Sequence, residues 1–141
     1  VDPIKESVSS SKTPILGVCL GMQLLGLYSD EGRLPGVGLI QARSFSLKSL
    51  DSNIRVPNMG WSNVLPCADK KLFKSNEDYY RFYFAHSYFL KCSDEKDIAA
   101  TIAFKENICV AVERGNIFGV QFHPEKSHSS GLALLQRFVE I

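Results

Sequence analysis

The chain has 141 residues, of which 45% are hydrophobic and 22% are charged, and its formal net charge at pH 7 is +1. This length suits one domain, since domains most often hold roughly 100–150 residues. A charge this close to zero gives no indication of a nucleic-acid or membrane partner, and no apolar stretch reaches the ~20 residues that span a bilayer. We therefore expect a single cytoplasmic domain over residues 1–141.

The first elements follow from the hydrophobic pattern of residues 1–28. Residues 1–14 are polar and interrupted by proline, which is typical of a helix end followed by a connection. The nearly continuous apolar run that precedes Cys19 indicates a strand covered on both faces, as in a parallel α/β sheet. After it, Leu20, Leu24 and Leu27 recur at helical spacing. The expected order is strand, cysteine, helix.

Short strands and turns are predicted for the middle of the chain, residues 36–90. There Tyr80, Phe82 and Phe84 occupy alternate positions, as on one face of a strand. Three more strand-like runs follow between residues 97 and 123, joined by the hairpin-like connections KEN and RGN. A last helix is expected to bury an apolar stripe made of Leu132, Leu135, Phe138 and Val139.

The four cysteines lie too far apart in the sequence to form a C-x-x-C pair, and their positions are Cys19, Cys67, Cys92 and Cys109. This spacing gives no sign of a zinc knuckle or a redox motif. Reduced thiols in a cytosolic protein are the simpler interpretation. Cys19 alone lies in a chemically suggestive context.

The segment GVCLG, residues 17–21, has the G-x-Nuc-x-G form of a nucleophile elbow, with cysteine where hydrolases often carry serine. Glycines on both sides would let strand and helix approach without side-chain clashes. The helix N-terminus is expected to lower the thiol pKa, and the N–H of Leu20 to point where an oxyanion forms. The alternative is a small buried hydrophobic residue, because free cysteine is often buried. The elbow alone leaves both interpretations open.

The segment GVQFHPEKS, residues 119–127, supplies the partners that a cysteine nucleophile needs. His123 and Glu125 are expected to project to the same face, where the carboxylate would fix the imidazole tautomer. A metal site that adds His128 is a weaker alternative, since His128 follows a break in the strand pattern. A core histidine is the other alternative, and the charged neighbours Glu125 and Lys126 disfavour it.

Two aromatic segments, VPNMGW at residues 56–61 and YFAHSY around residues 83–88, have two interpretations. Aromatic residues at strand spacing are commonly sheet core, with His86 hydrogen-bonded at a strand end. The functional alternative is a pocket rim, with Trp61 and Tyr83 as interface anchors. The pattern alone favours the core.

Together, GVCLGMQLL and GVQFHPEKS resemble the signature of the class I (triad) glutamine amidotransferases. With PNMGW, YFAHSY and GLALLQRF added, the likeness covers about residues 14–138 and is greatest to the glutaminase subunits of imidazole glycerol phosphate synthases. The resemblance implies a Cys-His-Glu triad in which Cys19 attacks the side-chain amide of L-glutamine, His123 shuttles the proton and Glu125 orients His123. It implies no metal and no cofactor.

The resemblance also implies a heterodimer with a (β/α)₈-barrel synthase (cyclase) subunit, which receives the ammonia for imidazole glycerol phosphate formation in L-histidine biosynthesis. The residues that it implies for holding glutamine are Leu20, Gln23, His86, Ser87 and Tyr88. Those that it implies near the partner are Trp61, Tyr83 and Lys126.

The fold implied is a mixed, largely parallel α/β three-layer sandwich of the flavodoxin-like type, lacking its N-terminal strands. The family places a P-G-x-G turn before the nucleophile as half of the oxyanion hole, whereas here the similar LPGVGLI, residues 34–40, follows Cys19. We therefore expect the C-terminal two-thirds of an amidotransferase domain. A truncated, catalytically silent relative that only binds the partner is an alternative.

A second departure concerns Asn58 and Ser62, which stand where the family commonly has His and Asn. In this respect the chain is similar to paralogous amidotransferases that supply ammonia for amidation of a nucleotide sugar in surface-polysaccharide synthesis. The acceptor of the ammonia therefore has two candidates.

Overall fold

The computed structural model describes residues 2–73 and 80–141, and within these ranges no helix has the length and hydrophobicity needed to cross a membrane. The helices are α1 (Asp2–Ser9), α2 (Leu20–Leu24) and α3 (His128–Val139), with short 3₁₀ turns at Leu47–Ser49, Glu95–Asp97 and Pro124–Lys126. The strands are β1 (Ile15–Val18), β2 (Tyr28–Ser29), β3 (Leu34–Pro35), β4 (Ala42–Ser46), β5 (Asn58–Asn63), β6 (Leu65–Pro66), β7 (Arg81–His86), β8 (Tyr88–Cys92), β9 (Ile98–Phe104), β10 (Glu106–Arg114) and β11 (Ile117–Val120).

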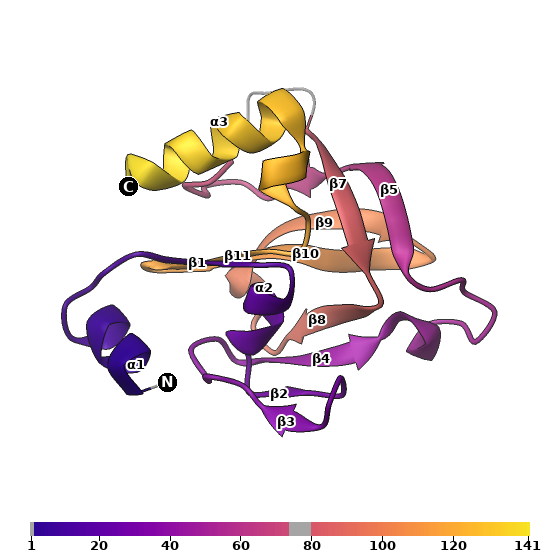
Figure 1. Cartoon of the computed structure of the whole chain (residues 1–141), viewed down its shortest axis with the longest axis horizontal. Coiled ribbons are helices and arrows are strands. Elements are labelled where there is room, and N and C mark those ends of the chain that lie inside the picture. The colour runs from indigo at the N-terminus through magenta and orange to yellow at the C-terminus, as the bar shows by residue number, and fades with distance from the viewer. Residues whose placement is uncertain (1, 74–79) are drawn as a thin grey trace.

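Most strands join one mixed sheet, whose main path runs β1-β11-β10-β8-β4-β2-β3, while β5 and β7 pair separately (Figure 1). The mixed α/β class is as expected, but the expected parallel majority is not. Among the described residues, only β1 with β11 and β2 with β4 pair in parallel. The physical reason is connection length, since Lys105 alone separates β9 from β10, and a link this short can join only antiparallel strands.

Two buried clusters on opposite faces of the sheet give the expected three layers. Adjacent residues of β10 contribute to different clusters, because successive side chains of a strand point to opposite faces. Val112 packs in the cluster that contains Met22 of α2, and Ala111 packs in the cluster that contains Leu134 of α3. Figure 1 shows α1 and α2 on one side of the sheet and α3 on the other.

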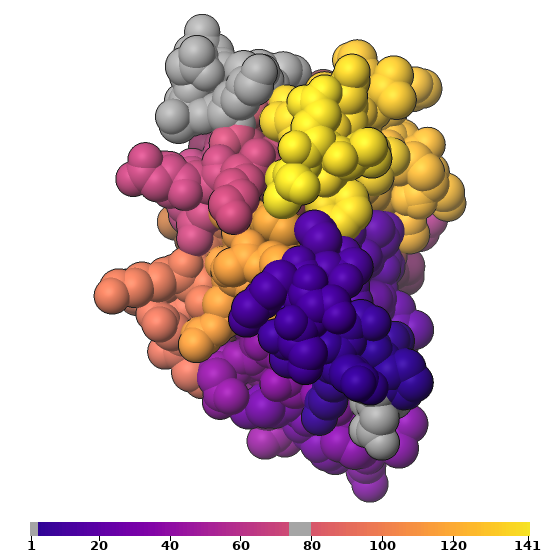
Figure 2. Space-filling view, turned by 90° about the vertical axis from the view of Figure 1, so that its left-hand side faces the viewer, coloured from indigo at the N-terminus to yellow at the C-terminus, as the bar shows by residue number. Residues whose placement is uncertain are grey.

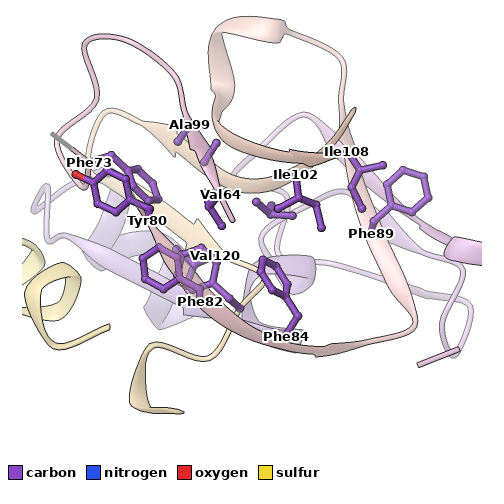
Figure 3. Packing of buried hydrophobic residues seen from close by; sticks show 14 of the residues in the cluster. Val64, Phe73, Tyr80, Phe82, Phe84, Phe89, Ala99, Ile102, Ile108 and Val120 are labelled. Atoms are coloured by element: carbon purple, nitrogen blue, oxygen red, sulfur yellow. The ribbon is translucent and has the colours of Figure 1, made fainter. Parts of the chain in front are cut away.

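The larger cluster is rich in aromatic rings and includes the predicted alternation of β7. Phe82 and Phe84 are fully buried, and Figure 3 shows Phe82 beside Val120 of β11. The ring of Phe82 stacks on that of Phe122, with centroids 3.8 Å apart. Because Phe122 immediately precedes His123, this packing fixes the position of the chain that leads into the His-Pro-Glu segment.

The predicted apolar face of the helix after Cys19 is wrong. Leu20, Leu24 and Leu27 are 54%, 45% and 45% exposed, whereas Met22 is completely buried. Helix α2 has only five residues, and its buried side is set by contact with β11. A Cβ on Gly119 would lie 2.9 Å from Cγ of Met22, so the absence of a side chain there admits Met22.

The predicted stripe of the last helix is also only partly correct. Leu132 and Val139 are 68% and 82% exposed. The buried residues of α3 are Gly131 and Leu134, three positions apart on one side. Gly131 contacts the carbonyl of Pro124 so closely that no Cβ fits, which decides the side of α3 that faces the sheet.

The N-terminal helix closes the edge of the molecule next to β1. Figure 2 shows α1 and the segment after it below the C-terminal helix. The side chain of Asn116, in the β10–β11 turn, donates hydrogen bonds to the carbonyls of Val8 and Thr13 at 2.9 and 2.8 Å. These bonds fasten α1 to the same end of the sheet from which β1 runs toward Cys19.

Candidate active site

Cys19 occupies the turn between β1 and α2, as the elbow motif predicts. Its backbone has φ 54° and ψ −109°, a left-handed conformation that is uncommon and costly for a residue with a side chain. The Cys19 N–H donates to the carbonyl of Val120 at 2.8 Å, and its own carbonyl accepts from the N–H of Met22 at 3.1 Å. Both ends of the turn are therefore fixed, one to β11 and one to α2.

The two glycines of the motif differ in their roles. A Cβ on Gly17 would lie 2.5 Å from the carbonyl oxygen of Gly21, which a real side chain cannot do. At Gly21 itself, an added Cβ would meet nothing within 4 Å. Close approach of strand and helix thus requires glycine at position 17 and not at position 21, which corrects the symmetric expectation.

The Cys19 sulfur lies between a carbonyl and an amide. Its S–H donates to the carbonyl of Ala85 at 3.8 Å, and Nε2 of Gln121 donates to the sulfur at 3.7 Å. Burial raises the pKa of the thiol above its usual value, although the hydrogen bonds from the Leu20 N–H and the Gln121 amide lower it. The expected lowering of this pKa is therefore wrong, since desolvation of the thiolate outweighs the donors around it.

His123 and Glu125 meet, although a 3₁₀ turn rather than strand alternation brings them together. Nδ1 of His123 lies 3.2 Å from one carboxylate oxygen of Glu125 and 3.4 Å from the other. The backbone is held by Ser127, whose hydroxyl donates to the carbonyl of His123 at 2.6 Å and accepts from the N–H of Tyr83 at 3.0 Å. The imidazole is thus oriented by a carboxylate while its Nε2 edge remains available.

Strand β7 places the cysteine and the histidine relative to each other. The His123 N–H donates to the carbonyl of Tyr83 at 2.9 Å, while the Cys19 thiol donates to the carbonyl of Ala85. Carbonyls two residues apart on one side of a strand are separated by about 6.7 Å. Within residues 2–73 and 80–141 no hydrogen bond joins the two side chains directly. The spacing leaves room for a reacting group between them.

A cavity of about 220 Å³ opens beside the Cys19 sulfur. Four of the residues expected to hold substrate line it, while the fifth, Tyr88, contributes only a carbonyl that accepts from Gln23 at 3.3 Å. Sequence reasoning missed Glu31, whose carboxylate belongs to a loop that only the fold brings near Cys19. The lining consists of Cys19, Leu20, Gln23, Glu31, Pro57, Ala85, His86 and Ser87.

His86 forms a buried wall of this cavity in its neutral form. Its Nδ1–H donates to the carbonyl of Tyr88 at 2.8 Å, so Nε2 is left to accept from the amide of Asn58 at 3.1 Å. Burial lowers the pKa of His86, and the charge of nearby His123 adds to the effect. Asn58, one of the two departures from the family pattern, therefore supports a cavity residue.

The residues expected near a partner gather on one surface. Tyr83 packs edge-on against Trp61 with ring centroids 5.9 Å apart, and Nζ of Lys126 lies 6.0 Å from the Tyr83 ring centroid. The ring of His128 stacks on Trp61 at 5.3 Å, rather than joining His123. Among the described residues, no three His, Cys, Asp or Glu side chains are grouped as a metal site.

The LPGVGLI segment lies against the end of α2 and does not line the cavity. The N–H of Val37 donates to the carbonyl of Leu24 at 2.7 Å, and the N–H of Gly38 donates to that of Gly26 at 2.9 Å. Its role is therefore to hold the loop after α2. This agrees with the expectation that it does not replace the P-G-x-G turn of the family.

A cysteine on a strained strand-helix turn, a histidine oriented by glutamate and a shared cavity define a cysteine-dependent acyl-transfer site on a three-layer α/β fold. The family model for "Glutamine amidotransferase class-I" matches residues 2–141, and the chain belongs to that family. The family resemblance stated from the motifs is thereby confirmed.

Similar sequences narrow the relationship within the family. The chain is 44% identical to the imidazole glycerol phosphate synthase subunit HisH of Leptospira interrogans, over 99% of this chain and 70% of that protein. It is 43% identical to subunit HisH 2 of Methanococcus maripaludis, over 99% of this chain and 69% of that protein. For subunit HisH 2 of Pseudomonas aeruginosa the identity is 42%, over 100% and 69%.

Solved structures support the fold. A glutamine amidotransferase crystal structure superposes with a TM-score of 0.70 at 16% identity, covering 99% of this chain and 66% of the other. A putative GMP synthase component from Thermoplasma acidophilum gives 0.69 at 18% identity, covering 99% and 62%. A glutamine amidotransferase from Thermotoga maritima gives 0.63 at 21% and covers 98% and 50%. The chain thus spans half to two-thirds of these structures.

Proposed function

We propose that this chain is the glutaminase part of an imidazole glycerol phosphate synthase, which releases ammonia from L-glutamine for a synthase subunit. The observation that carries the proposal is the 44% identity to a HisH subunit over nearly the whole chain, combined with a cavity at the Cys19 sulfur. Neither a metal nor a cofactor enters the proposed reaction.

The cavity offers glutamine a complementary set of groups. Glu31 provides a carboxylate on the cavity wall, suited to the substrate's α-ammonium group. Oε1 of Gln23 is buried and has no hydrogen-bond partner, so it is free to accept from an N–H of the substrate. The side-chain amide carbon then lies beside the Cys19 sulfur.

The chemistry proceeds by acyl transfer. Cys19 sulfur attacks the amide carbon, and its proton passes by way of His123 to the leaving nitrogen, so that ammonia departs and a glutamyl thioester remains. Water then attacks the thioester, His123 accepts its proton, and glutamate leaves as the Cys19 thiol reforms. Glu125 holds Nδ1 of His123 and stabilises the imidazolium that forms in each half-reaction.

The raised pKa of Cys19 favours the neutral thiol in the empty cavity. The proton must therefore be removed during attack, which is the task of His123 as general base. In the tetrahedral intermediate, the N–H of Leu20 is the candidate oxyanion donor from this chain.

The exposed aromatic surface around Trp61 and Tyr83 is the proposed contact with a (β/α)₈-barrel synthase subunit. Trp61 is 37% exposed and Met59, on the same strand, is 63% exposed. Aromatic and methionine side chains are enriched in protein interfaces. Because this surface adjoins the His123 segment, ammonia formed at Cys19 would have a short route to a partner bound there.

A second candidate keeps the glutaminase chemistry and delivers ammonia to a nucleotide sugar. The departures Asn58 and Ser62 favour it, since both lie on β5, the strand that also presents Trp61. A changed partner surface is expected where the acceptor enzyme differs.

The test is release of glutamate and ammonia from glutamine by the chain, alone and with the barrel protein from the same genome. We expect equal amounts of both products, loss of activity in Cys19→Ala, and stimulation when the barrel protein carries its ribonucleotide ligand. Stimulation by a nucleotide sugar instead would assign the second candidate. No release in any combination would identify a catalytically silent, partner-binding relative.

A further inference from the structure

Gln121 is a buried amide that the proposed triad does not use. It follows directly on β11, and its N–H donates to the carbonyl of Val110 at 2.8 Å, which fixes its backbone. Its side chain is fully buried. The parallel register pairs Val18 of β1 with Val120 of β11, so the next residues along, Cys19 and Gln121, lie side by side.

Both polar atoms of the Gln121 side chain contact residues of the cavity. Nε2 donates to the Cys19 sulfur at 3.7 Å, and Oε1 accepts from Nε2 of Gln23 at 3.2 Å. Nε2 of Gln23 also donates to the carbonyl of Tyr88 at 3.3 Å. The bonds form one chain from Tyr88 through both glutamines to the sulfur.

This chain has two consequences. The Gln23 amide nitrogen has both of its hydrogens engaged, so the amide cannot flip, and Oε1 of Gln23 remains the buried atom without a partner. At the other end, a donor aimed at sulfur favours the thiolate over the thiol, because hydrogen bonding to the charged form stabilises it. The Gln121 amide is one of the groups that offset the effect of burial on the Cys19 pKa.

We propose that Gln121 is a positioning residue whose amide N–H supports the Cys19 thiolate and whose carbonyl fixes the Gln23 amide for substrate. The action on Gln23 toward glutamine rests on the function proposed above. The action on the thiol does not, because it concerns the free protein.

Three variants separate the two actions. Gln121→Met removes both hydrogen bonds at similar volume. Gln121→Glu keeps the acceptor for Gln23 but replaces the donor by a carboxylate. Gln136→Met is the matched control, since Gln136 is an exposed residue of α3. Far-UV circular dichroism and thermal unfolding establish that each variant is folded, and Gln121→Glu, the closest in shape, serves if Gln121→Met does not fold.

The first measurement is the pH dependence of Cys19 alkylation by iodoacetamide, quantified on the Cys19 peptide by mass spectrometry. We expect both Gln121 variants to titrate at higher pH, with alkylation below the pKa slowed about 3- to 10-fold, since one pKa unit corresponds to a tenfold change. Gln136→Met should match the unchanged protein. An unaltered Cys19 profile in a folded Gln121 variant would overturn the action on the thiol.

The second measurement is protection of Cys19 from alkylation by added glutamine. We expect Gln121→Met to need about tenfold more glutamine for half-protection, and Gln121→Glu to need a nearly unchanged amount because it still accepts from Gln23. Equal protection of the unchanged protein and Gln121→Met would overturn the action on Gln23. If glutamine protects no variant at all, the proposed substrate fails, while the alkylation profiles still decide the action on the thiol.

Discussion

The elbow glycine at position 17 provides a quantitative test of how the site is built. In Gly17→Ala, the new Cβ lies 2.5 Å from the Gly21 carbonyl oxygen, 2.6 Å from its carbon and 2.8 Å from the Met22 nitrogen, where ordinary contact begins at 3.4 Å. All three atoms are backbone of α2, so β1 and α2 must separate by about 0.9 Å. Overpacking of this kind costs about 1–3 kcal/mol of unfolding free energy.

The same displacement moves the Cys19 turn and the N–H of Leu20, and a misplacement of about 1 Å can cost a hundredfold in rate. Urea unfolding measures the stability of Gly17→Ala, and glutamine hydrolysis with the barrel partner measures its kcat/KM. The control is Gly21→Ala, which meets nothing within 4 Å and is expected to gain about 0.5–1 kcal/mol by replacing a helical glycine. The reasoning is refuted if Gly17→Ala is as stable and active as the unchanged protein, or if Gly21→Ala is equally damaged.

Three further outcomes are expected. The lowered pKa of His86 means that the unfolded chain binds more protons, so its contribution to stability is intact above about pH 6.5 and declines as pH falls toward the folded-state pKa; thermal unfolding between pH 8 and 5 should show this decline, and His86→Gln should flatten it. Buried Glu113 accepts from the N–H groups of Lys71 and Leu72 at 3.0 and 3.3 Å, so Glu113→Leu should lower the urea-derived unfolding free energy by about 2 kcal/mol, whereas an equal loss in Glu113→Gln would contradict a hydrogen-bonding cause. Trp61→Ala should weaken binding of the barrel partner by about tenfold or more in calorimetry while leaving thermal stability nearly unchanged, and unaltered affinity would move the interface elsewhere.

The local elements were predictable where a short stretch of sequence decides them. The strand, cysteine and helix around position 19 and the hairpins at Lys105 and Gly115 follow from apolar runs and turn residues. Their buried faces were less predictable. In α2 the leucines at helical spacing face outward, because contact with Gly119 rather than helix periodicity selects Met22 for the core.

Contacts between distant segments account for what the sequence could not predict at the site. Glu31 reaches the cavity through a loop, and its local pattern gives no sign of this position. Gln121 was within a recognised motif, yet its role depends on the β1–β11 register that places it beside Cys19. The direction of the Cys19 pKa was misjudged because burial depends on the whole fold, whereas a helix terminus can be identified locally.

The central claim is that Cys19 is the nucleophile toward the side-chain carbonyl of glutamine. The most direct measurement is covalent labelling by the diazoketone analogue of glutamine, 6-diazo-5-oxo-L-norleucine, with the modified residue located by mass spectrometry. We predict one label per chain on Cys19, prevented by glutamine, absent in Cys19→Ala and slower in His123→Gln. Absence of labelling with the barrel partner present, or labelling that persists in Cys19→Ala on Cys67, Cys92 or Cys109, would contradict the claim.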